Sequence, residues 1–370
     1  MGRSALVLLA RAWIALAPLV LVVGCGAPKT YVSEPGPYDR VPAEWREPLA
    51  AARLAFERGD PQRAYRLVTP LALERPKLIA VRCFRQEIEL ALLTLEGRLG
   101  ENLVAAGPEE ARRVLARHYE DQAEGRLEPE AYVLAARLAD DATAALALLD
   151  EADTLDPRCV WVHYGRAWWR YRDRRFKEAR EALRAAQRLD RGHLPSLRLH
   201  ATILAGAGDI EPAIGALEVW LERSEGDPLF AGAERADALL DLAALRVLAE
   251  EPRAALELLG ELDPRAVRDP LRAEAVRAAA LEARGDSDGA LAAVARALLA
   301  RPDALLPLVQ RAMLLRAAGD AVGEAAAWRE LLVRTDVERP GAEIDFEAAL
   351  FRMQAHARLA RLTGSAGTAP

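Results

Sequence analysis

The side chains best suited to acid–base or metal chemistry are few in this chain and lie far apart. The 370 residues include five histidines: His118, His163, His193, His200 and His356. No two of them have the His-Glu-x-x-His spacing, and no Cys-x-x-Cys pair or phosphate-binding loop is present. His193 and His200 are seven residues apart, which is two helical turns and too far for one metal ion. We therefore predict that the chain is not an enzyme and holds no metal or cofactor.

The stretch Asp286-Ser287-Asp288-Gly289 has part of the pattern of a calcium-binding loop. It lacks the third acidic ligand before its glycine and the distant glutamate that complete such a loop. It also coincides with a turn that recurs along the chain. We therefore expect no calcium site there.

The N-terminus indicates a different chemistry, that of a cysteine. Arg3 and Arg11 precede an apolar run over residues 12–23, which is followed by Gly24 and Cys25. This run is shorter than the ~20 residues that cross a bilayer, so residues 1–24 are predicted to be a secretory signal peptide that is removed. The Val-Val-Gly-Cys ending resembles the lipobox of bacterial lipoproteins. That resemblance implies that the Cys25 thiol receives diacylglycerol and becomes the new N-terminus. An ordinary signal peptide with a chance cysteine, or an uncleaved anchor, is the alternative.

Acyl chains such as palmitate on Cys25 would hold the protein on a membrane, because several chains together bind stably. In lipoproteins an aspartate after the cysteine retains the protein at the inner membrane. Gly26 stands there instead, and the resemblance therefore implies the periplasmic face of the outer membrane. Residues 26–43 contain four prolines and two glycines, so residues 25–44 are predicted to be a tether without regular structure.

Composition agrees with a soluble, secreted helical protein and argues against nucleic acid as a partner. The formal net charge is −6, and it becomes −8 when the two arginines of the signal peptide are removed (−6 − 2). This mild acidity argues against a general nucleic-acid binder. Besides Cys25 the chain has only Cys83 and Cys159, which are 76 residues apart in apolar helical contexts. We expect two separately buried thiols instead of a disulfide.

The part of the chain that follows the tether shows a 34-residue repeat. Gly285 and Gly319 are 34 residues apart and each opens a Gly-Asp turn. Equivalent turns fall at Asp140, Arg174 and Gly208. An alanine lies five residues after each of four turns, at Ala145, Ala179, Ala213 and Ala290. A fixed period of this length predicts a stacked helical solenoid, in which no unit buries its apolar face alone.

The pattern resembles the tetratricopeptide repeat (TPR) family, which pairs a small residue in helix A with two alanines in helix B, followed by a proline. Ala278, Ala290, Ala297 and Pro302 fit this pattern, and in the unit of Ala201 and Ala213 a tryptophan replaces the second alanine. The resemblance implies an all-α fold, a right-handed solenoid of six to eight helical hairpins. It covers residues 45–363, with a short tail at 364–370. It is uneven over residues 80–128 and 227–264, where we expect off-pattern helices and a shortened second helix. A last helix near 345–362 is predicted to cap the open end.

Tryptophan, tyrosine and arginine are concentrated between residues 161 and 184, and two interpretations of this segment compete. In the favoured one, four residues of the segment pack between helices: Trp161, Tyr164, Gly165 and Trp168. This requires about two more residues before the turn at 173–175 than the 34-residue period provides. In the other, the 34-residue period is strict and Ala167 is the small packing residue. Trp161, Tyr164, Trp168 and Tyr171 then project into the concave groove of the solenoid.

Trp168 and Trp169 are adjacent, so they point about 100° apart on a helix and cannot share one interface. One of the two is therefore expected at or near the surface. We place Trp169 on a ligand-facing surface, with Arg166 and Arg170 beside it, because aromatic and arginine side chains are enriched at binding hot spots. The alternative is that Trp169 packs in the core and the arginines only meet water.

These observations predict a non-enzymatic, lipid-anchored scaffold or assembly factor of the cell envelope that binds a protein or peptide partner. A pilotin-like or outer-membrane assembly helper is a variant of this prediction, because known lipoproteins carry such repeats. The alternative is a sensor or carrier that captures an anionic glycan or lipopolysaccharide through the Trp/Arg-rich unit at 161–184.

The lipid anchor can be tested at Cys25. The substitution Cys25→Ser should abolish incorporation of a fatty-acid probe, because serine offers no thiol for lipid transfer. Metabolic labelling of cells that express the natural chain or the variant measures this. Equal labelling of both proteins would contradict the lipoprotein prediction.

Overall fold

The computed structural model describes residues 41–335 and 346–365, and nearly all regular structure in them is α-helical. The exception is one short antiparallel β-hairpin, formed by β1 (Arg98–Leu99) and β2 (Leu103–Val104). The predicted all-α fold class is confirmed. In the described residues, no helix combines the length and the apolar character needed to span a membrane. Cys25, the rest of the predicted signal peptide and most of the tether lie outside the described residues, as do residues 366–370.

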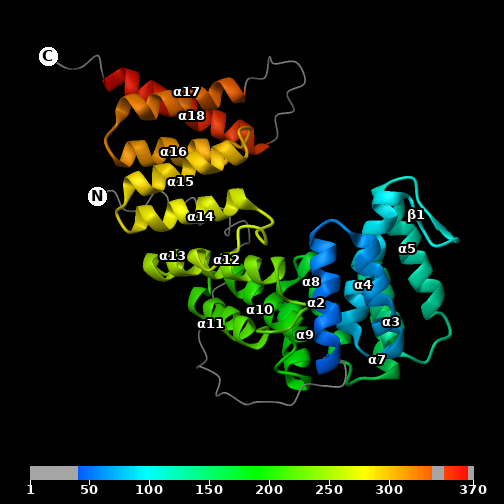
Figure 1. Cartoon of the computed structure of the whole chain (residues 1–370). Helices are drawn as coiled ribbons and strands as arrows, with labels where there is room; N and C mark the ends of the chain where they lie inside the picture. The colour runs from blue at the N-terminus through cyan, green and yellow to red at the C-terminus, as the bar shows by residue number, and fades with distance from the viewer. Residues whose placement is uncertain (1–40, 336–345, 366–370) are drawn as a thin grey trace. The chain divides into compact units, whose positions relative to one another are not determined.

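The helices follow one another as hairpins after a 3₁₀ turn, η1 (Ala43–Trp45) (Figure 1). The pairs are α2 (Arg46–Glu57) with α3 (Pro61–Glu74), α4 (Ile79–Glu96) with α5 (Pro108–Ala123), α6 (Pro129–Leu138) with α7 (Ala142–Leu155), α8 (Val160–Arg172) with α9 (Phe176–Leu189), α10 (Leu194–Ala207) with α11 (Ile210–Arg223), α12 (Ala233–Leu248) with α13 (Pro252–Gly260), α14 (Pro270–Ala283) with α15 (Ser287–Ala300), and α16 (Leu305–Ala317) with α17 (Ala321–Arg334). A last helix, α18 (Phe346–Ser365), packs on α17. The described chain thus holds eight hairpins (α2 to α17 taken in pairs), within the predicted range.

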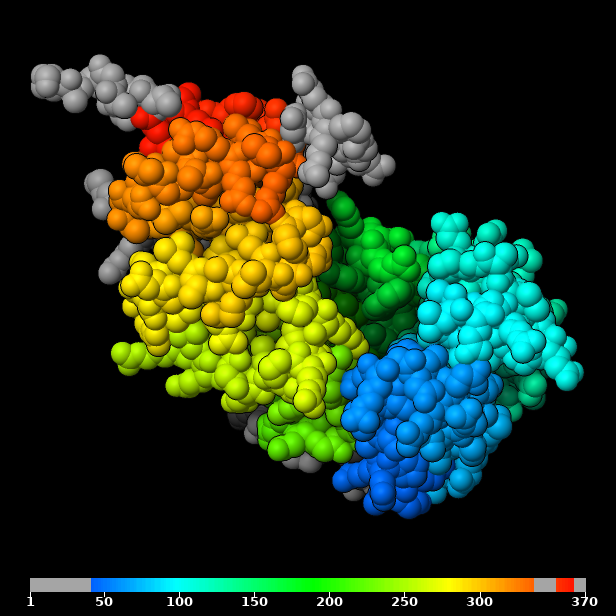
Figure 2. Space-filling model, turned by 45° about the horizontal axis from the view of Figure 1, so that its top comes forward, coloured from blue at the N-terminus to red at the C-terminus, as the bar shows by residue number. Residues whose placement is uncertain are grey.

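The hairpins divide into two compact units, and the boundary falls between Arg235 and Ala236 near the start of α12. The first unit contains η1 through α11. Its helices pack on their neighbours in chain order. In the space-filling view, the blue and cyan residues of this unit lie side by side (Figure 2). In the second unit, α13 to α18 also pack each on the next.

The recurring turns have a defined backbone conformation. Gly285 and Gly319 have φ values of +87° and +76°, a left-handed conformation that favours glycine. The following aspartates begin the next helix: Asp286 accepts a hydrogen bond from the backbone nitrogen of Gly289 at 2.9 Å, and Asp320 does the same for Gly323 at 2.8 Å. The stretch considered for calcium is therefore a helix N-cap. Its sequence Gly-Asp-Ser-Asp-Gly also matches the Gly-x-Ser-x-Gly pattern of a nucleophile elbow, but it joins two helices and not a strand to a helix.

Small residues allow the paired helices to approach closely. The alanines predicted by the repeat, Ala145, Ala179, Ala213 and Ala290, are all 0% exposed. Ala179 of α9 lies in one apolar cluster with residues of α8 and α10, so it sits where two hairpins meet. The helices α3, α7 and α15 each end two residues before a proline, at Glu74, Leu155 and Ala300, because the residue before a proline is disfavoured in the helical conformation.

The predicted irregularities are also present. The α4–α5 connection contains the β-hairpin in place of a Gly-Asp turn, and α13 has only nine residues. At the turn before α13, Glu250 adopts a left-handed φ of +62° in the place where other repeats use glycine. Cys83 and Cys159 are both buried and form no disulfide, which confirms the expectation of separate thiols.

The role of the buried alanines can be tested by overpacking. Ala179→Trp and Ala290→Trp should each destabilise the protein by roughly 1–3 kcal/mol or more, because the paired helices leave no room for a ring. Arg301→Ala, on an exposed turn, should change stability by less than about 0.5 kcal/mol. Thermal or urea unfolding measures both effects. Similar midpoints for all three variants would contradict packing through small residues.

Candidate functional site

The register of α8 decides which side chains of the Trp/Arg-rich segment face the groove. Ala167 is 0% exposed and packs in a cluster with Ala179 and Leu183 of α9. Helix α8 runs from Val160 to Arg172 and is followed by Arg174 with a left-handed φ of +61°, so the turn closes at its repeat position. The two extra residues required by the favoured interpretation are not inserted. Its register was therefore wrong, and the 34-residue period holds through this hairpin. Its packing is partly confirmed, because Trp161 is 4% exposed in a core cluster against which Tyr164 and Trp168 also pack.

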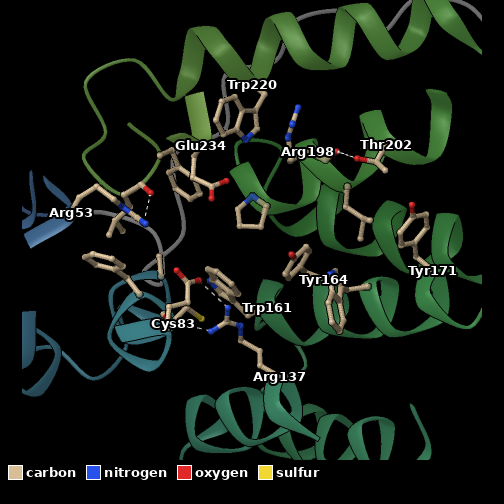
Figure 3. A pocket seen from close by; sticks show the side chains of 18 residues that line it. Arg53, Cys83, Arg137, Trp161, Tyr164, Tyr171, Arg198, Thr202, Trp220 and Glu234 are labelled. Carbon is tan, nitrogen blue, oxygen red and sulfur yellow. Dashed lines mark hydrogen bonds and ion pairs between the residues drawn. The ribbon is translucent and has the colours of Figure 1, made fainter. Parts of the chain in front are cut away.

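With this register, one face of α8 borders a cavity of about 360 Å³ in the first unit (Figure 3). Trp161, Tyr164, Trp168 and Tyr171 all line it, at successive spacings of three, four and three residues. The other walls come from α2, α4, α6, α10, α11, the segment that follows α11 and the start of α12. The cavity is therefore formed mainly by the first helices of successive hairpins.

The lining is aromatic with a few charges of both signs. Its aromatic side chains are Phe84, Trp161, Tyr164, Trp168, Tyr171, Trp220 and Phe230, and its charged ones are Arg53, Glu87, Arg137, Arg198 and Glu234. In Figure 3, Trp161, Tyr164 and Arg137 lie on the side opposite Trp220, Arg198 and Glu234. Aromatic walls with a few polar groups are the usual composition of a binding pocket.

Hydrogen bonds hold the wall at Arg137 in place. Its guanidinium donates to Gln86 Oε1 at 2.7 Å, to Glu87 Oε1 at 3.3 Å and to the backbone oxygen of Cys83 at 3.3 Å. Arg137 thereby ties α6 to α4 across the cavity wall. The positive charge is compensated by Glu87, so this part of the wall is polar but nearly neutral.

The wall at Tyr164 is rigid and uncharged. Tyr164 contacts the rings of Trp161 and His193 edge-on, at centroid distances of 5.7 and 5.5 Å. Burial raises the pKa of Tyr164 to about 12, so its hydroxyl keeps its proton at neutral pH. Burial lowers the pKa of His193 to about 3, so that ring is neutral as well, and its Nδ1 is 2.7 Å from Ser196 Oγ. These groups position side chains and add no charge to the cavity.

Trp169 is buried and not at the surface as predicted, although it borders a second, smaller cavity of about 280 Å³. It is 3% exposed, and its Nε1 donates to the backbone oxygen of Ala136 at 3.0 Å. The turn of about 100° between adjacent residues directs it toward α6, the first helix of the preceding hairpin. Trp168 is the half-buried member of the pair and lines the cavity. One of the two rings was thus correctly expected near the surface, but the wrong one was chosen.

Arg166 and Arg170 lie beside Trp169 on α8 but are not among the cavity-lining residues. Arg166 forms ion pairs with Asp150 and Asp153 of α7, at 2.6 and 3.0 Å. Arg170 Nε is 3.8 Å from Glu178 of α9. These arginines link neighbouring helices. Their proposed contact with a partner stays a hypothesis, and the cavity geometry does not favour it.

Several lining residues were not predicted, although one of them left a signal in the sequence. Trp220 stands where the repeat pattern has its second alanine, and a bulky residue at that position indicates room beside it. Arg53 and Phe230 have no such signal, because they reach the cavity through contacts between distant parts of the chain. In the part of the chain that the structure describes, no group of three or more His, Cys, Asp or Glu side chains could hold a metal ion. The site is equipped to bind and orient a ligand.

Comparison with known proteins identifies the fold. No family model matches the sequence, and no curated protein matches it. The structure is similar to a tetratricopeptide repeat protein from Parabacteroides merdae, with a TM-score of 0.50 and 14% identity over 68% of this chain and 92% of that one. The fold is therefore that of TPR proteins, as the sequence pattern predicted.

Two further solved structures are more distantly similar. Pseudomonas aeruginosa pilF has 19% identity over 66% of this chain and 99% of its own, with a TM-score of 0.44. YrrB, described as a TPR protein with an unusual peptide-binding site, has 20% identity over 52% of this chain and 97% of its own, with a TM-score of 0.42. Scores this low carry no argument about function.

The two adjacent tryptophans should respond differently to truncation. Trp169→Ala should cost ~3–5 kcal/mol, because it removes a core ring and leaves the Ala136 carbonyl without its donor. Trp168→Ala should cost about 1–2 kcal/mol, since its ring is half-buried. Urea unfolding of both variants measures the difference. A Trp168→Ala protein as unstable as Trp169→Ala would contradict the assignment of Trp168 to the cavity wall.

Proposed function

We propose that this protein is a non-enzymatic scaffold or assembly factor that binds a protein or peptide partner in the concave cavity of its first unit. The observation that carries the proposal is the row of four aromatic side chains on α8 that lines this cavity. Such rings provide large contact areas at little cost in side-chain entropy, and tryptophan and tyrosine are enriched at binding hot spots. The TPR fold supports the proposal, because a solenoid presents extended surface to partners.

The proposed location is the cell envelope, with the protein attached by lipid on Cys25 at the periplasmic face of the outer membrane. The lipobox-like ending at Cys25 and the glycine after it support this location. Residues 26–43, if extended like polyproline, would span up to ~55 Å between the membrane and the first helix. That distance would allow the folded units to reach partners in the periplasm.

Capture of an anionic glycan or lipopolysaccharide is less well supported by the charges of the Trp/Arg-rich unit. Arg175 is paired with Glu178, and Arg180 with Asp209, as Arg166 is with two aspartates. Arg172 lies over the rings of Trp168 and Trp169, 4.8 and 4.7 Å from their centroids. Because carboxylates already compensate much of this positive charge, the unit offers only a weak field to an anionic polymer.

The proposal is tested by affinity capture from a detergent-solubilised cell envelope. The natural chain should retain a specific protein, and Trp168→Ala should retain at least tenfold less of it, as expected for a hot-spot ring worth about 2 kcal/mol. Leu73→Ala is the matched control, since Leu73 is 67% exposed on α3 and does not line the cavity.

Loss of capture in Trp168→Ala but not in Leu73→Ala supports the proposal. Capture that persists in Trp168→Ala would contradict it. Capture of carbohydrate in place of protein would favour the glycan alternative.

A further inference from the structure

The smaller cavity of the first unit, which Trp169 borders, has a lining and a charge of its own. Its volume is about 280 Å³, and its walls come mainly from α4, α6 and α8, with one residue each from α5 and α7. It shares one wall with the larger cavity, and three residues of that wall, Trp161, Tyr164 and Arg137, are labelled in Figure 3. The residues that line only the smaller cavity decide what it can bind.

The interior of the smaller cavity is apolar. Apart from Gln86 and Arg112, the residues that line only this cavity are Leu90, Val133, Ala136, Leu138, Leu149, Gly165 and Trp169. Gln86 is 2% exposed, and both ends of its amide are already bonded within the protein. Its Nε2 donates to the backbone oxygen of Leu134 at 2.9 Å, and its Oε1 accepts from Arg137 at 2.7 Å. A molecule inside the cavity therefore contacts mainly apolar surface.

The volume sets the size of that molecule. An apolar cavity of about 150 Å³ in another protein holds one benzene ring. The smaller cavity here is nearly twice as large, so it has room for an apolar body of roughly ten carbon atoms. Such a body is a short hydrocarbon chain or two fused rings.

Arg112 adds a positive charge that no carboxylate of the described chain compensates. Its Nη2 lies 3.5 Å from the backbone oxygens of Arg137 and Ala139, and among the described residues it forms no ion pair. These two oxygens belong to the C-terminal end of α6, which supplies only about half a negative charge. The other arginine of the lining, Arg137, is paired with Glu87. Arg112 is thus suited to bind an anion.

The smaller cavity is open to solvent on the side of its charged residues. The side chain of Glu87 is 47% exposed, and Leu90 and Arg112 are half-buried. A ligand can therefore enter without a change in the fold. The arrangement of a charged rim and an apolar interior fits an amphipathic molecule, whose anionic group stays partly in water while its apolar body is buried.

We propose that the smaller cavity binds a small amphipathic carboxylate, with its anionic group on Arg112 and its apolar body between α4, α6 and α8. This ligand is distinct from the protein or peptide partner of the larger cavity, and the inference goes beyond the proposed function. Arg112 and Leu90 line only the smaller cavity, so changes there test this ligand separately from capture of the partner.

Isothermal titration calorimetry of the full chain tests the class of ligand. The probes are decanoate, which has a flexible chain, and 2-naphthylacetate, which has a planar ring system. At least one of them should bind saturably at a single site with a submillimolar Kd. Decylamine has a similar chain but is a cation at neutral pH, and it should bind at least tenfold more weakly than decanoate. Failure of both carboxylates to bind, or equal affinity for decanoate and decylamine, would overturn the proposal.

Matched variants locate the site. Arg112→Gln should weaken binding roughly fivefold, as expected for a half-exposed ion pair, whereas Arg113→Gln, at an exposed position next to it on α5, should have no effect. Leu90→Trp should abolish binding because the larger ring fills the cavity. Thr202→Trp should leave binding unchanged, since Thr202 lines only the larger cavity. Thermal unfolding identifies any variant that has lost its fold.

Equal affinities of Arg112→Gln and Arg113→Gln, both folded, would overturn the role of Arg112. Binding that survives in Leu90→Trp but is lost in Thr202→Trp would place the carboxylate in the larger cavity and would also overturn the proposal. Arg112→Gln should still capture the envelope protein, because Arg112 does not line the larger cavity. Failure of the capture experiment would therefore leave the result of the titrations unchanged.

Discussion

Close packing of helices through fully buried alanines is the constraint on which the rest of this structure depends. Ala145, Ala179 and Ala213 are 0% exposed where the second helix of a hairpin meets its neighbours. A larger side chain at these positions would separate the helices, so their spacing fixes the rotation of each helix about its axis. In α8 this rotation places Ala167 in the packed interface, and it therefore turns Trp161, Tyr164, Trp168 and Tyr171 toward the cavity.

The aromatic cavity follows from stacking and does not require a separate domain. Each hairpin contributes its first helix to the wall, so α4, α6, α8 and α10 together present one surface assembled from residues far apart in the chain. Hydrogen bonds from Arg137 to Gln86 and Glu87 hold this surface in shape before any ligand binds. A preorganised wall reduces the entropy lost on binding, which favours a binding role for this cavity.

Periodicity in the sequence predicted the hairpins, their turns and their buried alanines, because these depend on interactions within one repeat and its neighbour. The face of α8 was predicted less well. The favoured interpretation treated its rings as packing residues, although the strict period already indicated Ala167 for that role. The assignment of Trp169 failed because adjacency shows only that two rings diverge, whereas the neighbouring helix α6 decides which of them is buried. The contact of Arg53 with Leu229 could not be predicted from the sequence. It depends on the packing angles of all the hairpins between these two residues, which together bring distant segments into contact.

The claim that the cavity of the first unit is the partner-binding surface is tested most directly by site-specific photo-crosslinking in cells. A benzophenone amino acid at position 202 would sit in the cavity wall on α10, and the same amino acid at position 154 would sit on α7 outside it. The natural residues Thr202 and Thr154 are both exposed threonines that donate to a backbone carbonyl, so the two sites are closely matched. The account predicts a cross-link to one envelope protein from position 202 and none from position 154. A cross-link of equal yield from both positions, or from position 154 alone, would contradict it.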